Sequence, residues 1–132
     1  VGRFTVLNKE KQSMFINFSN HSSEAWEKAQ LNAAMEYGEV IDIPFPAVNP
    51  YSNKEEIYKI CEEYVAKIMN LNPSCVLCQG EFCVAYGVIS ALKKFGVKVV
   101  AACSERKSVE RKVGDNVEKT SSFSFVQFRE YE

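Results

Sequence analysis

Short apolar runs alternate with longer segments of helical periodicity along most of the chain. Four runs have the length and the β-branched and aromatic content of buried strands: Met14–Phe18, Glu39–Ile43, Cys75–Gln79 and Val97–Cys103. Three segments between them repeat apolar residues at three- and four-residue steps: Ser23–Tyr37, Lys54–Met69 and Phe82–Phe95. The pattern therefore predicts the element order βαβαβαβ.

The predicted helices differ in their apolar faces. Ser22 or Ser23 is placed to cap the first helix, and Ser52 or Asn53 to cap the second. The first is expected to bury one face, made of Trp26, Ala29, Ala33 and Tyr37. The third is apolar nearly all round, which predicts that it packs on the sheet and on a second element as well.

The C-terminal third of the chain changes to residue-by-residue alternation. Two alternating segments, Ser108–Val113 and Glu118–Tyr131, flank a Gly-Asp-Asn turn and predict an antiparallel hairpin. A slip in the alternation near Gln127 predicts a β-bulge. Because βαβ connections are right-handed, the first four strands are expected to be parallel, with helices on both faces. The predicted fold class is α/β: a Rossmann-like three-layer α/β/α domain with a C-terminal antiparallel hairpin.

One domain, residues 14–132, accounts for this pattern. With 132 residues and 46% hydrophobic content, the chain has the size and composition of a single globular domain. Residues 1–13 are expected to be an N-terminal extension. Lys9-Glu10 fits the codons of a ribosome-binding sequence, which would make Met14 the natural start, and Arg3–Leu7 has the residues of an added edge strand.

Charge and hydropathy exclude several classes of partner. Sixteen Lys and Arg residues face seventeen Asp and Glu residues, and a net charge of -1 gives no field that would hold duplex DNA or an anionic membrane. No apolar run approaches the roughly 20 residues of a membrane helix, and no leader with a cleavage site opens the chain, so a cytoplasmic protein is expected. A polyanionic ligand must then be small and lie in a local pocket.

The five cysteines are expected to be reduced thiols, because their number is odd and their spacing irregular. Cys75-x-x-Cys78, followed by Cys83, is the one spacing that also occurs in zinc and redox sites. Residues three apart on a strand face opposite sides of a sheet, however, and the single histidine, His21, is distant in the chain. Core thiols are therefore predicted, with neither a metal nor another cofactor.

Ligands of open parallel sheets bind at the carboxyl ends of the strands, where three predicted turns lie. The first offers hydroxyl, amide and imidazole groups together with the free N–H groups of a helix N-terminus, a combination that suits phosphate oxygens. These residues are Ser19, Asn20, His21 and Ser22. The alternative is that the serines only cap a helix.

The other two turns combine backbone access with charge. In Gln79-Gly80-Glu81, glycine lets backbone amides approach a ligand, although Glu81 alternatively serves as a helix cap. The loop after the fourth strand carries Ser104, Glu105 and Arg106, and a guanidinium can bind two phosphate oxygens. The alternative here is ordinary solvated charge. The chain has no Walker loop, GxGxxG fingerprint or GxSxG elbow.

Four short stretches give the chain a resemblance to known proteins: Phe15–His21, Gln79–Glu81, Ser104–Arg106 and Phe125–Tyr131. Together they resemble small stand-alone CRISPR-associated proteins of type III systems, related to the CARF (Rossmann-like) domains that sense cyclic oligoadenylates. The likeness implies one CARF-type domain over residues 14–132. It also implies a homodimer whose two-fold axis brings paired pockets around a ring-shaped RNA messenger.

Some proteins of this kind are ring nucleases that need no metal. A ribose 2′-hydroxyl attacks the adjacent phosphorus, so the protein holds the ring in line and stabilises charge. The resemblance then makes His21 the candidate general acid or base and Arg106 the candidate for charge stabilisation. It implies a ligand-binding set made of Ser19, Asn20, Ser22, Gln79, Gly80, Glu81, Ser104 and Glu105.

Two other functions stay open at this point. One is a sponge or sensor that binds the same ring without cleaving it. The other is an interaction protein that dimerises through the apolar third helix or the aromatic C-terminal strand and takes no small ligand.

Overall fold

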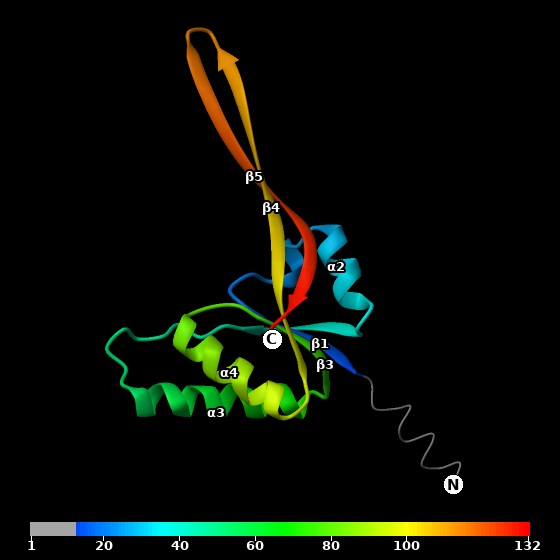
Figure 1. Cartoon of the computed structure of the whole chain (residues 1–132), viewed down its shortest axis with the longest axis vertical. Helices are drawn as coiled ribbons and strands as arrows, with labels where there is room; N and C mark the ends of the chain where they lie inside the picture. Colours follow the sequence, from blue (N-terminus) through cyan, green and yellow to red (C-terminus); the bar gives the residue numbers. More distant parts are fainter. Residues whose placement is uncertain (1–12) are drawn as a thin grey trace, which may run out of the picture.

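A single five-stranded sheet organises the computed structural model, which describes residues 13–132. The strands are β1 (Met14–Ser19), β2 (Glu39–Pro44), β3 (Pro73–Cys78), β4 (Lys98–Val113) and β5 (Asn116–Glu130). Their order in the sheet is β2-β1-β3-β4-β5; the first four are parallel and β5 is antiparallel to β4 (Figure 1). The α/β class and the C-terminal hairpin are confirmed, but the strand order is not that of a simple Rossmann sheet. The strand predicted at Arg3–Leu7 and nearly all of the extension lie outside the described residues.

Three helices and one short 3-10 turn connect the parallel strands of the described chain. They are η1 (Ser23–Ala25), α2 (Lys28–Met35), α3 (Lys54–Asn70) and α4 (Phe82–Lys94). A capping box starts α3: the Asn53 side chain accepts from the N–H of Glu56, and the Glu56 carboxylate accepts from the N–H of Asn53. Within residues 13–132, no helix is long and apolar enough to cross a membrane.

The single helix predicted for Ser23–Tyr37 is wrong. The chain is extended at Trp26 and Glu27, with ψ near 150°, so the segment divides into η1 and α2. This break lets the Trp26 ring stand edge-on to Phe15, with ring centroids 6.2 Å apart. In α2 the fully buried residue is Ala34, whereas the predicted face contained Ala33.

The sheet is packed on both faces. Ile16 and Phe18 of β1 belong to the core cluster under α3 and α4, whereas Phe15 belongs to the cluster under α2. Cys75 and Cys78 divide between the same two clusters, which confirms that they face opposite sides. Figure 1 shows α3 and α4 together and α2 apart from them. α4 packs on α3 as well as on the sheet, as its apolar sequence predicted.

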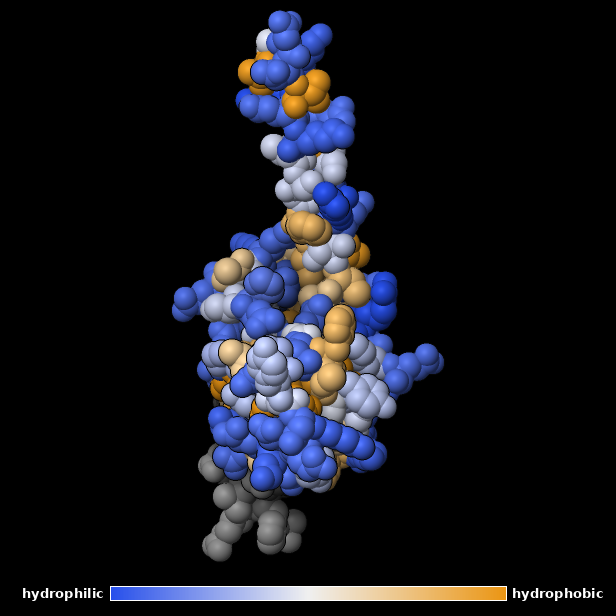
Figure 2. Space-filling model, turned by 90° about the vertical axis from the view of Figure 1, so that its left-hand side faces the viewer, coloured by the Kyte–Doolittle hydropathy of each residue, from blue (hydrophilic) through white to orange (hydrophobic). Residues whose placement is uncertain are grey.

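β4 and β5 continue beyond the body as a two-stranded ribbon (Figures 1 and 2). All residues from 104 to 123 are exposed. The predicted fourth strand and the first arm of the hairpin are therefore one strand, and the loop predicted at residues 104–107 is wrong. Two cross-strand ion pairs join the arms, Glu110 to Lys119 at 3.5 Å and Arg111 to Glu118 at 3.6 Å.

The predicted bulge near Gln127 is confirmed. Cys103 pairs with Gln127 and Ser104 pairs with Phe125, so one extra residue of β5 lies between these two rungs. The extra residue shifts the alternation and places Phe125 and Phe128 on one face, with their rings edge-on at 4.9 Å. The base of the ribbon therefore carries an aromatic face on the side of α2.

Thiol reactivity tests the buried part of this fold. Burial raises the pKa of Cys75 to about 11 and the pKa of Cys78 to about 12, whereas Cys83 is exposed. Iodoacetamide at about pH 8.5 is therefore expected to alkylate Cys83 in the native protein, and Cys75 and Cys78 only after unfolding in urea. Peptide mass spectrometry after timed labelling measures this. Equal labelling of Cys75 and Cys83 in the native protein would contradict a buried β3.

Candidate functional site

A concave pocket lies at the carboxyl ends of β1 and β3, between η1 and the base of the ribbon. Its volume is about 410 Å³. Six of the ten predicted site residues line it: Ser19, Asn20, His21, Gln79, Gly80 and Ser104. The other lining residues are Ala25, Trp26, Glu27, Gln30, Leu77, Ala102, Phe123 and Phe125. We call this cavity the aromatic pocket. It lies beside β1, whose neighbours in the sheet are β2 on one side and β3 on the other, so the direction of strand addition reverses at β1. Ligands of open parallel sheets bind at such a reversal.

Aromatic residues from two separate elements form the walls of the aromatic pocket. Trp26 lies between η1 and α2, and Phe125 lies at the base of the ribbon. The carboxylate of Glu27 accepts a hydrogen bond from the N–H of Phe125 at 3.2 Å and so ties the two walls together. The sequence showed these aromatic residues and the slip that marks the bulge, but it did not show the helix break at Trp26 and Glu27, which places Trp26 beside the same cavity.

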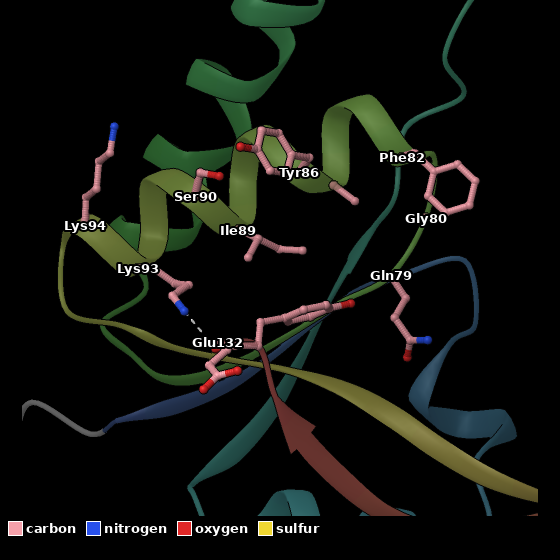
Figure 3. A pocket seen from close by; sticks show the side chains of 11 residues that line it. Gln79, Gly80, Phe82, Tyr86, Ile89, Ser90, Lys93, Lys94 and Glu132 are labelled. Atoms are coloured by element: carbon pink, nitrogen blue, oxygen red, sulfur yellow. Dashed lines mark hydrogen bonds between the residues drawn. The ribbon is translucent and has the colours of Figure 1, made fainter.

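Gln79 and Gly80 form the floor for structural reasons. β3 ends at Cys78, and the Gln79 side-chain carbonyl accepts the N–H of Ala102 at 2.8 Å, in the place that a longer β3 would occupy. Figure 3 shows the Gln79 side chain directed away from α4. A Cβ on Gly80 would lie 2.5 Å from the ring of Phe45, so only glycine fits there. The turn is thus shaped by packing as well as by access to the pocket.

A buried amide positions the loop that follows β1. The side chain of Asn17 is 2% exposed, and its Nδ2 donates to the carbonyl of His21 at 2.8 Å and to Oδ1 of Asp42 at 2.9 Å. Its Oδ1 accepts from the hydroxyl of Ser19 at 2.7 Å. The bond to the His21 carbonyl holds the main chain of this loop directly, the bond from Ser19 orients a hydroxyl that accepts from the N–H of His21, and the bond to Asp42 joins the loop to β2.

Asp42, at the end of β2, occupies the position predicted for phosphate. Its carboxylate accepts from the N–H of Ser23 at 3.2 Å and from the hydroxyls of Ser23 at 2.9 Å and Ser22 at 3.3 Å. The N–H group at the start of η1 is consequently paired with a carboxylate, and the expectation of free donors for an anion is wrong at this turn. Sequence reasoning missed Asp42 because it lies twenty residues away from the serines it binds.

The remaining predicted residues lie outside the aromatic pocket. Ser22 lines a neighbouring hollow of about 390 Å³, and the carboxylate of Glu81 accepts the N–H of Val84 at 2.8 Å as the cap of α4. Glu105 and Ser104 are adjacent on a strand and therefore face opposite sides of the ribbon. Arg106 lies on the Ser104 side, two residues further out, and its guanidinium donates to the hydroxyl of Ser121 at 3.2 Å.

The groups around the aromatic pocket suit a planar heterocycle better than a phosphate. Three aromatic rings can stack on a base, and the amides of Asn20, Gln30 and Gln79 can pair with its edge. Among the lining residues of the described part, 13–132, Glu27 is the one carboxylate and none is Lys or Arg. Within residues 13–132, no group of His, Cys, Asp and Glu side chains is arranged to hold a metal ion.

A larger hollow of about 810 Å³ lies on the other side of Gln79 and Gly80, between α4 and the end of β5 (Figure 3). The Tyr131 hydroxyl donates to the carbonyl of Cys78 at 2.8 Å, and the Lys93 ammonium donates to the carbonyl of Tyr131 at 2.8 Å. These bonds fasten the C-terminal residues to the body. Six of the ten predicted residues line the aromatic pocket, which we therefore take as the candidate site.

The fold and the pocket define an α/β protein with a ligand-sized cavity at the carboxyl edge of a parallel sheet. Residues 13–129 match the family model described as the Uncharacterized protein MJ1673 family, and the chain belongs to this family. No curated protein and no solved structure matches the chain.

Proposed function

We propose that the protein binds a cyclic oligoadenylate of type III CRISPR defence in the aromatic pocket, acts as a homodimer, and cleaves the ring without a metal. One observation carries the proposal: stacking rings and three amides meet in a pocket at the carboxyl edge of the sheet, and no Lys or Arg of residues 13–132 lines it. The resemblance of residues 14–132 to a CARF-type, Rossmann-like domain supports it, as do the parallel strands with helices on both faces.

Adenine is the base that this set of groups favours. Asn and Gln side chains pair bidentately with adenine, because an amide offers one acceptor and one donor side by side. Gln79 already uses its carbonyl on Ala102, which leaves Gln30 and Asn20 to pair with the base edge. Trp26 and Phe125 then stack on the ring faces, an interaction worth about 1–3 kcal/mol per base.

Cleavage requires little beyond this placement. The ribose 2′-hydroxyl loses its proton and attacks the adjacent phosphorus, and the bond from phosphorus to the 5′-oxygen of the next nucleotide breaks. The opened ring ends in a 2′,3′-cyclic phosphate and a protonated 5′-hydroxyl, so the protein contributes alignment and proton transfer. His21 lies at the edge shared by the aromatic pocket and the neighbouring hollow, and it is the histidine available for proton transfer. Arg106, on the Ser104 face of the ribbon, is the group proposed to stabilise phosphate charge.

The test measures binding and products together. Cyclic tri-, tetra- and hexa-adenylate are incubated with the protein in EDTA; calorimetry gives affinity and chromatography gives products. We expect one adenylate ring to bind and to be linearised. Gln30→Leu should weaken binding at least about tenfold, because the base edge loses its partner. His21→Ala should retain affinity and lose turnover.

The controls separate base from phosphate recognition. Gln127→Leu removes an exposed glutamine outside the pocket and should leave binding unchanged. A cyclic oligouridylate of the same size carries the same phosphates and should bind at least about tenfold more weakly. Binding without products would identify a sponge or sensor and remove the cleavage step. No binding of any ring would favour an interaction protein and overturn the proposal.

A further inference from the structure

The ribbon leaves one edge of β4 open. β3 pairs with β4 only from Lys98 to Val100, and Gln79 takes the N–H of Ala102. From residue 104 to 113, β5 lies on one side of β4, and no strand of the described chain lies on the other. Two-stranded ribbons are marginally stable alone in water, and open edges pair with further strands. This edge is therefore suited to strand pairing.

The sequence along the open edge is complementary to itself. An acidic–basic pair occurs twice, as Glu105-Arg106 and as Glu110-Arg111. When two copies of β4 run antiparallel about Ser108, Arg106 lies opposite the partner's Glu110 and Glu105 lies opposite the partner's Arg111. By symmetry, four pairs of opposite charges form across the junction. A second copy of this chain is thus the occupant that fits.

Hydrogen-bond directions support the same register. The N–H of Ala102 points to Gln79, and the N–H of Phe125, the partner of Ser104 in the ladder, points to Glu27. Both N–H groups point away from the β4–β5 ladder. In the part of β4 that extends beyond the body, the even-numbered residues therefore direct their backbone N–H and C=O groups toward the open edge. Two copies of β4 can exchange backbone hydrogen bonds only where residues with groups at the open edge lie opposite each other. Registers that pair even-numbered with odd-numbered positions are therefore excluded.

Neighbouring allowed registers bring like charges together. Moving the centre from Ser108 to Lys107 places Lys107 opposite the partner's Lys107. Moving it to Val109 places Lys107 opposite the partner's Arg111. The register centred on Ser108 avoids both conflicts and pairs small side chains on the axis.

The ion pairs within the ribbon extend across the junction. Glu110 pairs with Lys119 in its own chain, and the partner's Arg106 would lie on its other side. Arg111 pairs with Glu118 in its own chain, and the partner's Glu105 would lie on its other side. Each row then alternates in sign over three strands, so every central charge has an opposite charge on both sides.

We propose that two copies pair through the open edges of β4, antiparallel about Ser108, and that the partner's Lys112 completes the aromatic pocket. In this register Ser104, which lines the pocket, lies opposite the partner's Lys112. Directly opposite residues of a sheet point to the same face, so this ammonium lies beside a cavity that no Lys or Arg of its own chain lines within the described residues. The role of Lys112 rests on the proposed function, because a phosphate next to the base would bind it; the pairing does not.

The geometry also sets the number of ligands. The Ser104 residues of the two chains are separated by eight steps along the paired strands, about 27 Å. Each pocket therefore combines the body of one chain with the ribbon of the other. We expect one ring per chain rather than one ring shared by two pockets.

Charge reversal tests the pairing without any ligand. Sedimentation equilibrium should give the wild-type protein twice its 15.0 kDa chain mass. Glu110→Arg faces the partner's Arg106 and should raise the dimer dissociation constant at least about tenfold. Lys119→Glu also breaks the ion pair between Glu110 and Lys119 within the chain. Because Lys119 lies on β5, away from the open edge, this variant should remain dimeric. The double variant Arg106→Glu, Glu110→Arg restores opposite charges and should restore the dimer.

A disulfide locates the two-fold axis. Ser108→Cys places two thiols opposite each other, with Cα atoms about 5.5 Å apart, within reach of a disulfide. Mild oxidation should link the chains, as non-reducing electrophoresis will show. Ser122→Cys, an exposed serine of β5, should not form this link. A wild-type monomer at all concentrations, or a dimer that Glu110→Arg leaves intact, would overturn the pairing; the charges would then only protect the edge.

Lys112→Gln tests the completed pocket. We expect the dimer to persist and adenylate affinity to fall at least about tenfold, because one phosphate contact is lost. An unchanged affinity would overturn the role of Lys112. If mass and disulfide results hold while no ring binds, the pairing stands and the proposed function falls, so the two failures are distinguishable.

Discussion

Replacing Asn17 with leucine is expected to lower the free energy of unfolding by about 3 kcal/mol. Leucine keeps the branched outline of the side chain but replaces the amide with bulkier methyl groups, and three hydrogen bonds disappear at a site that is 2% exposed. The hydroxyl of Ser19 and the carbonyl of His21 lose a buried partner. Asp42 loses a donor that offsets its charge, and desolvated groups without partners cost more than the bonds themselves.

The same substitution should release the loop that carries His21, so ring binding should weaken together with stability. Urea unfolding followed by Trp26 fluorescence measures the first effect, and calorimetry measures the second. Asn32→Leu is the matched control: Asn32 is exposed on α2, and its variant should stay within about 0.5 kcal/mol of the wild type. A loss below about 1 kcal/mol in Asn17→Leu would show that the amide network does not hold the loop.

Gly80→Ala is expected to cost about 2–3 kcal/mol, because the added methyl group meets a buried aromatic ring. The new Cβ would lie 2.5 Å from the ring of Phe45, which is 8% exposed and stacks on Phe18 at 4.6 Å. Both rings are buried in the core, so displacing either of them costs packing contacts. The pocket floor must therefore shift toward the cavity.

A double-mutant cycle tests the cause of that loss. Phe45→Leu removes part of the ring and leaves space for the methyl group, so the double variant Gly80→Ala, Phe45→Leu should be more stable than the sum of the two single losses predicts. Urea unfolding of the four proteins measures the coupling. Strict additivity would mean that the methyl group does not press on Phe45 and that Gly80 is required for another reason.

Periodicity predicted those elements that bury one face or both. β1, β2, β3, α3 and α4 all place apolar residues against the core, and their predicted bounds agree with the structure to within two residues, whereas β4 continues ten residues beyond the predicted strand end. The bulge was also visible, because an extra residue leaves a slip in the alternation at Gln127. Such patterns arise because the buried positions of a strand or helix recur with its period and take apolar residues.

The ribbon could not be predicted in the same way. Residues 104–107 bury neither face, so no apolar pattern distinguishes a strand from a loop there. The opposite problem affected α2. A continuous helical pattern from Ser23 hid a break at Trp26 and Glu27, where the indole packs edge-on to Phe15.

The site shows a third limit, set by distance along the chain. The turn after β1 was located correctly, and six predicted residues do meet in one cavity. The carboxylate that binds the start of η1 comes from β2, and the aromatic wall comes from β5. Sequence spacing contains no information on such pairings, so donors that looked available to a ligand are already used by Asp42.

The bulge at Cys103 and Ser104 also has a mechanical consequence. It lies where β4 leaves the body, and the ribbon beyond it is about 33 Å long. A tilt of about 10° at this point moves the ribbon tip by about 6 Å while Ser104 scarcely moves. The geometry of the ribbon would therefore amplify a small change of angle at the pocket wall into a larger displacement at its far end.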